Sequence, residues 1–509
     1  MADLNTAIAE TDTGNRISTG IPGLDHVLRG GLTSNRLYVI EGDPGAGKTT
    51  AGLQFLLEGV RRGERVLYVT LSESVTELSE VARSHGWNLG GIDLVELESL
   101  AERLGQESDY TVYHPADVEL GETLRRIRKA VEKMEPSRVV LDSVSELKIL
   151  SQSPPRYRRE ILALKQFFSG KRCTVLVLDD MSTQNGESQQ SQSIAHGVIR
   201  MERRSREYGS TRRQILIVKM RGVKYRDGYH DFTIETGGVR VYPRLSAADH
   251  WKAHARQEIL SGIGGLDELL GGGLDRGSSS LVIGPAGCGK TTLCSQYVMA
   301  ALERGESAAC YLFEESVNTF LDRASGMGMD FTRFIESGQL WLKQSDPAEL
   351  GPGEFSHDVR RAVERQNARV IVIDSINGYL NAMPSENFLL IHLRELLTYL
   401  GQQGVLTLLV LSQHGMVSRE PFGPIDVSFL ADTVILLRFF EAFGEVRMAI
   451  SVLKKRLGAH EHTLRELRLS SQGIQIGGPL QQFEGVLTGV PRYLGDKALG
   501  DKLSVELKK

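Results

Sequence analysis

Two segments of the chain have the spacing of glycines, lysine and threonine that binds phosphate. One runs from Gly284 to Thr291 and the other from Gly42 to Thr49, and their lysines lie 242 residues apart. In such a loop the glycines let backbone N–H groups point at phosphate oxygens, the lysine reaches the terminal phosphates, and the hydroxyl binds Mg²⁺. The pattern therefore predicts two sites for a nucleoside triphosphate with Mg²⁺. The predicted contacts are Gly42, Gly45, Gly47, Lys48, Thr49 and Thr50 in the first half, and Gly284, Gly287, Gly289, Lys290, Thr291 and Thr292 in the second.

Two aspartates are predicted to complete the metal sites. Apolar runs over 138–141 and 369–373 end in Asp142 and Asp374, each followed by a serine. Ligands of parallel sheets bind at the carboxyl ends of the strands, so these carboxylates should approach Thr49 and Thr291 and bind Mg²⁺ or its water shell. Capping of the following helix is the structural alternative.

A pair of glutamates in the second half could act on a nucleophile. Glu314 and Glu315 follow the apolar run 307–313, and a carboxylate that faces the terminal phosphate can orient or deprotonate a water or a protein hydroxyl. Solvated glutamates at a helix start, favoured by the helix dipole, are the alternative. In the first half only Glu73 is in the same register, and Ser72 stands where Glu314 sits. We therefore expect the second half to be better equipped for phosphoryl transfer.

A lysine and an arginine close a predicted hairpin in each half. The pairs are Lys219 with Arg221 and Lys454 with Arg456, far along the chain from their own phosphate loops. In a ring of subunits such cations can reach a neighbour's nucleotide and stabilise charge in the transition state. A solvated basic edge that discourages strand aggregation is the alternative.

The densest basic cluster of the chain surrounds the first of these hairpins. Glu202 and Glu207 are interleaved with its arginines, which favours an inter-subunit hairpin over a nucleic-acid contact. The arginines are Arg200, Arg203, Arg204, Arg206, Arg212 and Arg213.

All of these residues belong to an internal repeat that covers most of the chain. The segment 16–32 recurs as 258–274, again at an offset of 242. Strand-like and helix-like runs alternate in each half, and an antiparallel-looking hairpin closes each half. The alternation predicts an α/β fold of two tandem domains, each a doubly wound, mainly parallel sheet with an antiparallel hairpin extension. We expect the domains over 1–247 and 248–509, with a tail from about 477.

The composition of the chain limits the classes of partner and compartment that we expect. The formal net charge is -4 and the sequence pI is about 6.4, so the chain lacks the global basic field that drives nonspecific binding to nucleic acid. Its four cysteines have no metal-site spacing and indicate reduced, buried thiols. The sequence shows no signal peptide and no apolar run of transmembrane length. We therefore expect a soluble, cytoplasmic protein without a membrane or nucleic-acid partner.

Together these motifs resemble the KaiC-like members of the RecA/DnaB superfamily, which are tandem ATPases related to a cyanobacterial clock protein. The resemblance covers nearly the whole chain. It implies RecA-like domains, a double-ring homohexamer with ATP and Mg²⁺ at the subunit interfaces, an ATPase first domain, and a second domain that phosphorylates itself and removes the phosphate. It further implies a timer or signalling hub with a KaiB-like protein partner.

The resemblance also assigns residue roles. It makes Glu314 the base for phosphoryl transfer, with Glu315 beside it. In the first domain Ser72 occupies the place of a catalytic glutamate, which leaves Glu73 as the catalytic carboxylate. The two Lys-x-Arg pairs would act in trans, Lys454 and Arg456 on the second-domain nucleotide and Lys219 and Arg221 on the first-domain nucleotide.

The phosphate acceptor is where this chain departs from the family pattern. The acceptors are usually two adjacent hydroxyl residues just before an Ala-Asp-Thr-like strand. Ser428 matches the first acceptor, but Phe429 replaces the second. The sequence therefore predicts one phosphorylation site, Ser428, with a packed hydroxyl as the structural alternative.

Two other functions stay open at this point. A nucleic-acid-dependent ATPase of the same superfamily would want a basic channel and usually a zinc or helix-turn-helix module, and the sequence shows neither module. A nucleotide-binding scaffold would hold ATP in both halves without turnover.

Overall fold

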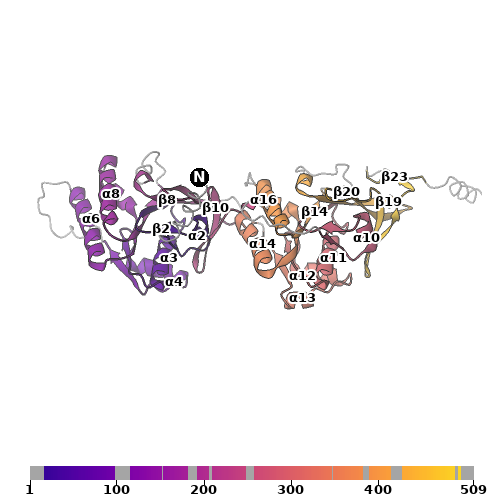
Figure 1. Ribbon diagram of the computed structural model, residues 1–509, viewed down its shortest axis with the longest axis horizontal. Coiled ribbons are helices and arrows are strands. Elements are labelled where there is room, and N and C mark those ends of the chain that lie inside the picture. The colour runs from indigo at the N-terminus through magenta and orange to yellow at the C-terminus, as the bar shows by residue number, and fades with distance from the viewer. Residues whose placement is uncertain are drawn as a thin grey trace, which may run out of the picture. The chain divides into compact units, whose positions relative to one another are not determined.

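A computed structural model describes residues 16–97, 115–151, 153–181, 192–205, 209–247, 257–346, 348–381, 389–413, 427–487 and 491–494. The chain divides into two compact units, Met1–Arg244 and Leu245–Lys509 (Figure 1). Each unit is built around one nine-stranded sheet with the same strand order.

The first sheet is parallel from β5 to β8 and antiparallel from β8 to β11. A short ladder, β1 (Arg16–Ile17) with β2 (Leu32–Thr33), precedes it. In spatial order its strands are β11 (Gly238–Tyr242), β10 (Tyr229–Glu235), β9 (Arg212–Met220), β8 (Gly197–Arg204), β3 (Leu37–Gly42), β7 (Thr174–Asp180), β6 (Arg138–Asp142), β4 (Val66–Thr70) and β5 (Ile92–Glu96).

The second sheet repeats this arrangement, so the predicted pair of doubly wound sheets is confirmed. It is preceded by β12 (Glu258–Ile259) with β13 (Leu274–Asp275). In spatial order its strands are β16 (Leu340–Gln344), β15 (Ser307–Leu312), β17 (Ala368–Asp374), β18 (Leu406–Ser412), β14 (Ser279–Gly284), β19 (Thr433–Ala442), β20 (Glu445–Lys455), β21 (Arg465–Ser470) and β22 (Gly473–Pro479).

Helices cover both faces of each sheet, because the central strands are apolar on both sides. On β3, Tyr38 and Ile40 belong to one buried cluster and Leu37 and Val39 to the other. Figure 1 shows helices on opposite sides of each sheet. In the first unit they are α2 (Leu24–Val27), α3 (Lys48–Arg61) and α4 (Val75–Ser84) against α6 (Pro115–Met134), α7 (Val144–Ser151) and α8 (Pro154–Ser169). In the second they are α10 (Gly264–Leu269), α11 (Lys290–Glu303), α12 (Val317–Ser325) and α13 (Thr332–Glu336) against α14 (Pro352–Gln366), α15 (Ile376–Asn381) and α16 (Leu389–Gln402).

The segment predicted as a tail is structured well past residue 477. It completes β22 and then forms the ladder of β23 (Phe483–Glu484) with β24 (Arg492–Tyr493). Between these strands, Val486 is buried in a small cluster with Phe440 of β19 and Ala449 of β20. Apolar contact with the hairpin tip therefore fixes this part of the chain, and residues 495–509 lie outside the described part.

Leu245 is 3% exposed within the core of the second unit, so that unit begins shortly before the domain boundary expected between residues 247 and 248. Residues 248–256, which follow this boundary, lie outside the described residues. Within the described helices, none has the length and apolar character to cross a membrane.

Candidate active sites

Each phosphate loop joins a central strand to a buried helix. In the first unit β3 ends at Gly42 and α3 begins at Lys48, and in the second β14 ends at Gly284 and α11 begins at Lys290. The glycine before each helix has a left-handed backbone, with φ of 100° at Gly47 and 89° at Gly289. These values require glycine, because a Cβ atom makes this region unfavourable. Both loops thus have the conformation that turns N–H groups inward.

The two loop lysines are buried, but they have different partners. The Lys48 ammonium donates to the carbonyl oxygens of Gly42 and Asp43 at 2.9 and 3.0 Å, and pairs with Asp180 at 2.6 Å. The Lys290 ammonium donates to the Pro285 carbonyl oxygen at 2.7 Å. Phosphate must therefore compete with a carboxylate for the lysine in the first unit.

The strand register explains this difference. Asp180 of β7 lies opposite Gly42, and Ser412 of β18 lies opposite Gly284. A hydroxyl thus occupies the second-unit position of Asp180. Sequence reasoning missed Asp180, although the paired acids that end the apolar run 174–178 were a signal.

A threonine–aspartate pair lies beside each loop. The hydroxyl of Thr49 donates to Asp142 at 2.8 Å, and that of Thr291 donates to Asp374 at 2.5 Å. Burial raises the pKa of both carboxyls. Hard oxygen ligands at the start of a phosphate-binding helix suit Mg²⁺, so these residues fit the metal that the sequence predicts.

The metal-site aspartate has one further neighbour in the first unit. The Tyr68 hydroxyl donates to Asp142 at 2.5 Å. Burial, and then the charge of Asp142, raises the pKa of Tyr68 well above its usual value. The corresponding second-unit residue is Cys310. Tyr68 pairs with Val140 and Cys310 pairs with Val372, and each valine lies two residues before the metal-site aspartate of its unit. The first site therefore holds its aspartate more tightly.

Replacing Asp142 by Asn should stabilise the nucleotide-free, Mg²⁺-free protein at pH 7. Because the folded-state pKa lies above the unfolded value of about 3.9, the charged form costs free energy, and folded Asp142 gains stability as the pH falls. The advantage of Asp142→Asn should shrink as the pH falls through the folded pKa. Urea unfolding at pH 7 and at lower pH measures it. Asp93→Asn, at an exposed site on β5, is the control, and a variant less stable than wild type at pH 7 would contradict the prediction.

The post-strand glutamates differ in their surroundings. Glu73 is half-buried and its Oε2 has no hydrogen-bond partner among the described residues. Burial, then Asp142, raises the pKa of Glu73. Glu315 is ion-paired with Arg323 of α12 at 2.6 Å, whereas Glu314 is exposed, with no hydrogen bond or ion pair within the described ranges. Of the second-unit pair, Glu314 is thus the carboxylate free to reach an acceptor.

Sequence reasoning also missed Arg323, because nothing in the sequence marks an arginine two turns into a helix as the partner of Glu315. The cation is close enough to Asp374 to lower its pKa, against the larger effect of burial. Its Nη2 is buried without a hydrogen-bond partner among the residues that the structure describes.

The second Lys-x-Arg pair holds the predicted acceptor segment. The Lys454 ammonium donates to the carbonyl oxygens of Ser428 and Ala431 at 3.0 and 2.8 Å. Arg456 pairs with Asp432 at 3.1 Å and donates to the Phe429 carbonyl oxygen at 3.2 Å. Ser428 begins a single 3₁₀ turn, η2 (Ser428–Leu430), and residues 414–426 before it lie outside the described part.

The first Lys-x-Arg pair fastens the equivalent segment of its own unit. Lys219 donates to the carbonyl oxygen of Gln192, and Arg221 donates to that of Ser193 at 2.8 Å. Both pairs therefore lie at the start of the strand next to the phosphate-loop strand.

The phosphate loops and the Lys-x-Arg pairs lie at opposite edges of each sheet. β14 and β19 are parallel; the loop follows the carboxyl end of β14, while Ser428, Lys454 and Arg456 lie at the start of β19. The six residues of β14 span about 20 Å. No side chain crosses that distance, so the pair and the acceptor cannot reach the phosphate loop of their own unit.

The basic cluster of the first hairpin is only partly a surface feature. Arg200 pairs at 2.7 Å with Glu41, which is 1% exposed and also accepts from Gln192. Arg200 is therefore a partner of the phosphate-loop strand within its own unit, and the inter-subunit role of the hairpin stays a prediction. Arg204 is exposed and pairs with Glu202 at 3.0 Å, while Arg206 lies outside the described residues.

With this geometry in place, the comparisons with known proteins decide the family. The family model "ATPase: KaiC" matches residues 17–246 and again residues 259–481. The chain belongs to the KaiC family. It is therefore an ATP-binding protein of a P-loop ATPase family, with two tandem RecA-like domains, as the sequence predicted.

Curated KaiC proteins match over almost the whole chain. Circadian clock protein KaiC3 of Synechocystis sp. is 28% identical over 492 residues, which cover 95% of this chain and 96% of that protein. The circadian clock oscillator protein KaiC of Picosynechococcus sp. is 28% identical over 488 residues, covering 94% and 92%. The protein of the same name from Synechococcus elongatus is 27% identical over 488 residues, with the same coverage.

Proposed function

We propose that this protein is a self-assembling, Mg²⁺-dependent ATPase whose second domain transfers phosphate to Ser428 of a neighbouring copy and removes it again. Residues 1–247 would hydrolyse ATP and hold the assembly, and residues 248–509 would carry the kinase and phosphatase activities. The assembly would be a double-ring homohexamer, and its phosphorylation state would be the output of a clock-like or signalling hub.

One observation carries this proposal. Each unit keeps its phosphate loop and acids at one edge of the sheet and its Lys-x-Arg pair at the other. Within one unit these groups cannot meet, and two chains placed head to tail would bring them into one site; repetition of that contact closes a ring or extends a filament. The presence of the arrangement in both units favours two stacked rings of the same copies.

The residues of the second site have separate tasks in the transfer. Lys290 and the loop N–H groups would bind the phosphates, while Thr291 and Asp374 would hold Mg²⁺, which offsets phosphate charge when bound. Glu314 would accept the hydroxyl proton of Ser428, whose oxygen forms the new bond to the γ-phosphorus as ADP leaves. Lys454 and Arg456 of the neighbouring copy would stabilise the charge that develops on the transferred group.

The first site is better suited to slow hydrolysis. Ser72 stands at the position of Glu314, and Asp180 forms an ion pair with the loop lysine Lys48. Glu73 is placed beside Asp142 and would orient water, with Lys219 and Arg221 acting from the neighbour. The relatives are circadian clock proteins by name, and we extend to this chain a KaiB-like protein partner that reads its nucleotide or phosphorylation state.

Nucleotide counting tests the two-site, two-task assignment. Lys48→Ala and Lys290→Ala each remove the charge-assisted contacts of one loop, worth about 1.5–3 kcal/mol apiece, so affinity at that site should fall about 10- to 100-fold. Wild type should then hold two nucleotides per chain and each variant one. Equilibrium dialysis with Mg-ATP gives the count, and mass measurement with and without ATP gives the assembly.

The comparison of the two variants separates their roles. Lys48→Ala should weaken assembly more, and Lys290→Ala should abolish phosphorylation. Two bound nucleotides with no hydrolysis by wild type would instead identify a scaffold.

A further inference from the structure

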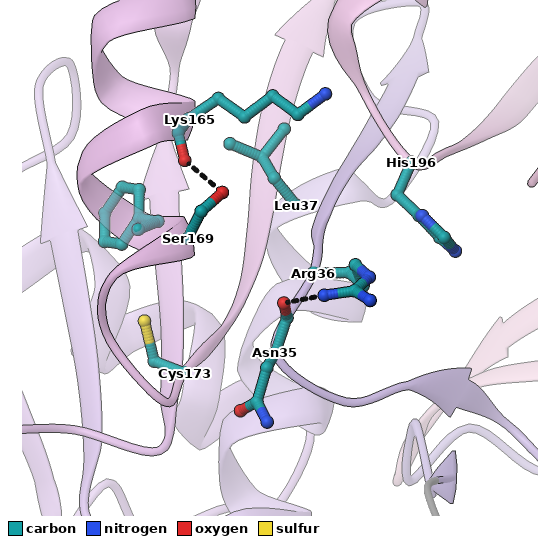
Figure 2. A pocket seen from close by; sticks show the side chains of 8 residues that line it. Asn35, Arg36, Leu37, Lys165, Ser169, Cys173 and His196 are labelled. Carbon is teal, nitrogen blue, oxygen red and sulfur yellow. Dashed lines mark hydrogen bonds between the residues drawn. The ribbon is translucent and has the colours of Figure 1, made fainter.

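A cavity of about 230 Å³ opens in the first unit, between α8 and the residues that precede β3 and β8. It lies at the sheet edge opposite the phosphate loop, since Leu37 begins β3 and His196 precedes β8. Figure 2 shows Lys165 reaching over Leu37 from α8, with Arg36 and His196 nearby. The lining contains these cationic or basic side chains and no carboxylate among the described residues.

The basic groups of the cavity interact with one another. Among the described residues the Lys165 ammonium donates once, to the carbonyl oxygen of Ile194 at 2.7 Å, which leaves two of its protons for another acceptor. The Nε2 atom of His196 is buried without a hydrogen-bond partner within the described residues. Burial, and then Arg36, Arg221 and Lys165, lower the pKa of His196. The repulsion among these groups favours a negatively charged ligand, and an anion beside His196 would favour the protonated ring, whose Nε2–H donates to it.

The second unit shows what fills this place when the residues equivalent to Arg36 and Lys165 are not basic. Tyr38 pairs with Gly197 in the first sheet, and the equivalent residue Ser280 pairs with Thr433 in the second. His196 and Asp432 directly precede Gly197 and Thr433, so they occupy equivalent positions. The Asp432 carboxylate accepts from the backbone N–H and the hydroxyl of Ser279, at 3.0 and 3.1 Å. It also pairs with Arg456, the second-unit equivalent of Arg221. A carboxylate of the chain itself therefore holds the arginine there.

The other two basic side chains are replaced as well. Ser278 occupies the position of Arg36, because each directly precedes the phosphate-loop strand of its unit. Leu397 occupies the position of Lys165, because Leu397 lies nine residues before β18 and Lys165 lies nine residues before β7. Among the described residues at this place, the second unit thus has one carboxylate and no counterpart of the Arg36 and Lys165 cations, whereas the first has three basic groups and no carboxylate. The two units balance charge at this position in opposite ways.

We propose that the cavity of the first unit binds a small oxyanion, of the class of inorganic phosphate, between Lys165, His196 and Arg36. The anion would stand where the Asp432 carboxylate stands in the second unit and would hold Arg221 as that carboxylate holds Arg456. The site is distinct from both phosphate loops and does not rest on the proposed kinase activity.

Binding of inorganic phosphate to a chain with disabled phosphate loops tests the proposal. In the full-length Lys48→Ala/Lys290→Ala background, without nucleotide, calorimetric titration with potassium phosphate against chloride at equal ionic strength should show one phosphate per chain. Loss of one charge-assisted partner should weaken that binding about tenfold or more. The variants to add are His196→Asp, which installs the second-unit carboxylate, Lys165→Met, and the exposed Arg36→Gln, which keeps the test usable if a buried change prevents folding.

The matched control is Lys171→Gln. This lysine lies in the connection between α8 and β7, outside the cavity lining, and carries the same charge. Phosphate binding should survive Lys171→Gln. The proposal is overturned if the background chain takes up no phosphate, if uptake survives the cavity substitutions, or if Lys171→Gln weakens it equally. The phosphate groups of a nucleotide bound to another copy could occupy the same cavity. If the cavity substitutions change ligand binding only when Mg-ATP is added to wild type, the cavity binds nucleotide phosphate, and the proposal of a free-anion site is overturned.

Discussion

Two chains that are each unable to phosphorylate themselves should regain phosphorylation when they are mixed. Lys290→Ala removes the second phosphate site but keeps Ser428, and Ser428→Ala removes the acceptor but keeps the site. Because Ser428 and the phosphate loop lie at opposite edges of the sheet, phosphate should pass from the Ser428→Ala chain to the Lys290→Ala chain. The signal should rise from background in each separate sample to a large fraction of wild type.

Mass spectrometry that retains phosphate, with one chain isotopically labelled, identifies the modified chain and residue. The control is a mixture of Lys290→Ala with a chain that carries both Lys290→Ala and Ser428→Ala, which should stay unmodified. Phosphate on Ser428 of dilute, monomeric wild type at the same rate would refute transfer between chains. Phosphate found only at other residues would refute Ser428 as the acceptor.

Replacing Glu314 by Gln should nearly abolish phosphoryl transfer while nucleotide binding persists. A positioned general base contributes about 10²- to 10⁴-fold, and the amide cannot accept the hydroxyl proton. Glu315→Gln is the informative neighbour, since Glu315 is paired with Arg323. Its loss should disturb the position of that cation and reduce the rate much less.

The rate of phosphate incorporation into Ser428, at saturating Mg-ATP, measures both variants. Dialysis with nucleotide should give two sites per chain in each, which excludes a binding defect. Glu73→Gln, measured by steady-state ATP hydrolysis, should lower the turnover of the first site alone. If Glu314→Gln phosphorylates at the wild-type rate and Glu315→Gln does not, the base is Glu315.

Phe429, at the second acceptor position, limits the number of phosphorylation states that we expect. Phe429 is 51% exposed, and its carbonyl oxygen accepts from Arg456. The backbone at this position therefore contacts the Lys-x-Arg hairpin, as the neighbouring Ser428 backbone does, but the side chain cannot take phosphate. A single phosphorylation step gives two states of each subunit, so we expect an on–off signal per subunit.

Several features could be predicted from the sequence because they depend on local spacing. The phosphate loops need glycine and lysine at fixed positions near one strand end, and those positions are visible in Gly42–Thr49 and Gly284–Thr291. The apolar runs before Asp142 and Asp374 showed where buried strands end. The offset of 242 residues showed that the whole arrangement is repeated, and it gave the tandem fold directly.

The contacts that distinguish the two units could not be predicted in the same way. Asp180 meets Lys48 across 132 residues, Arg200 meets Glu41 across 159, and the cavity brings Arg36 to His196 across 160. The sequence alone determined a tandem P-loop ATPase with unequal acids. Only the tertiary structure decided which side chains share a strand register, and therefore that loops and Lys-x-Arg pairs are held apart on opposite sheet edges. The physical reason is that the partner of a charged side chain depends on which strands lie side by side in the sheet. Strand order is set by burial of the whole core, and not by which residues are adjacent in the sequence.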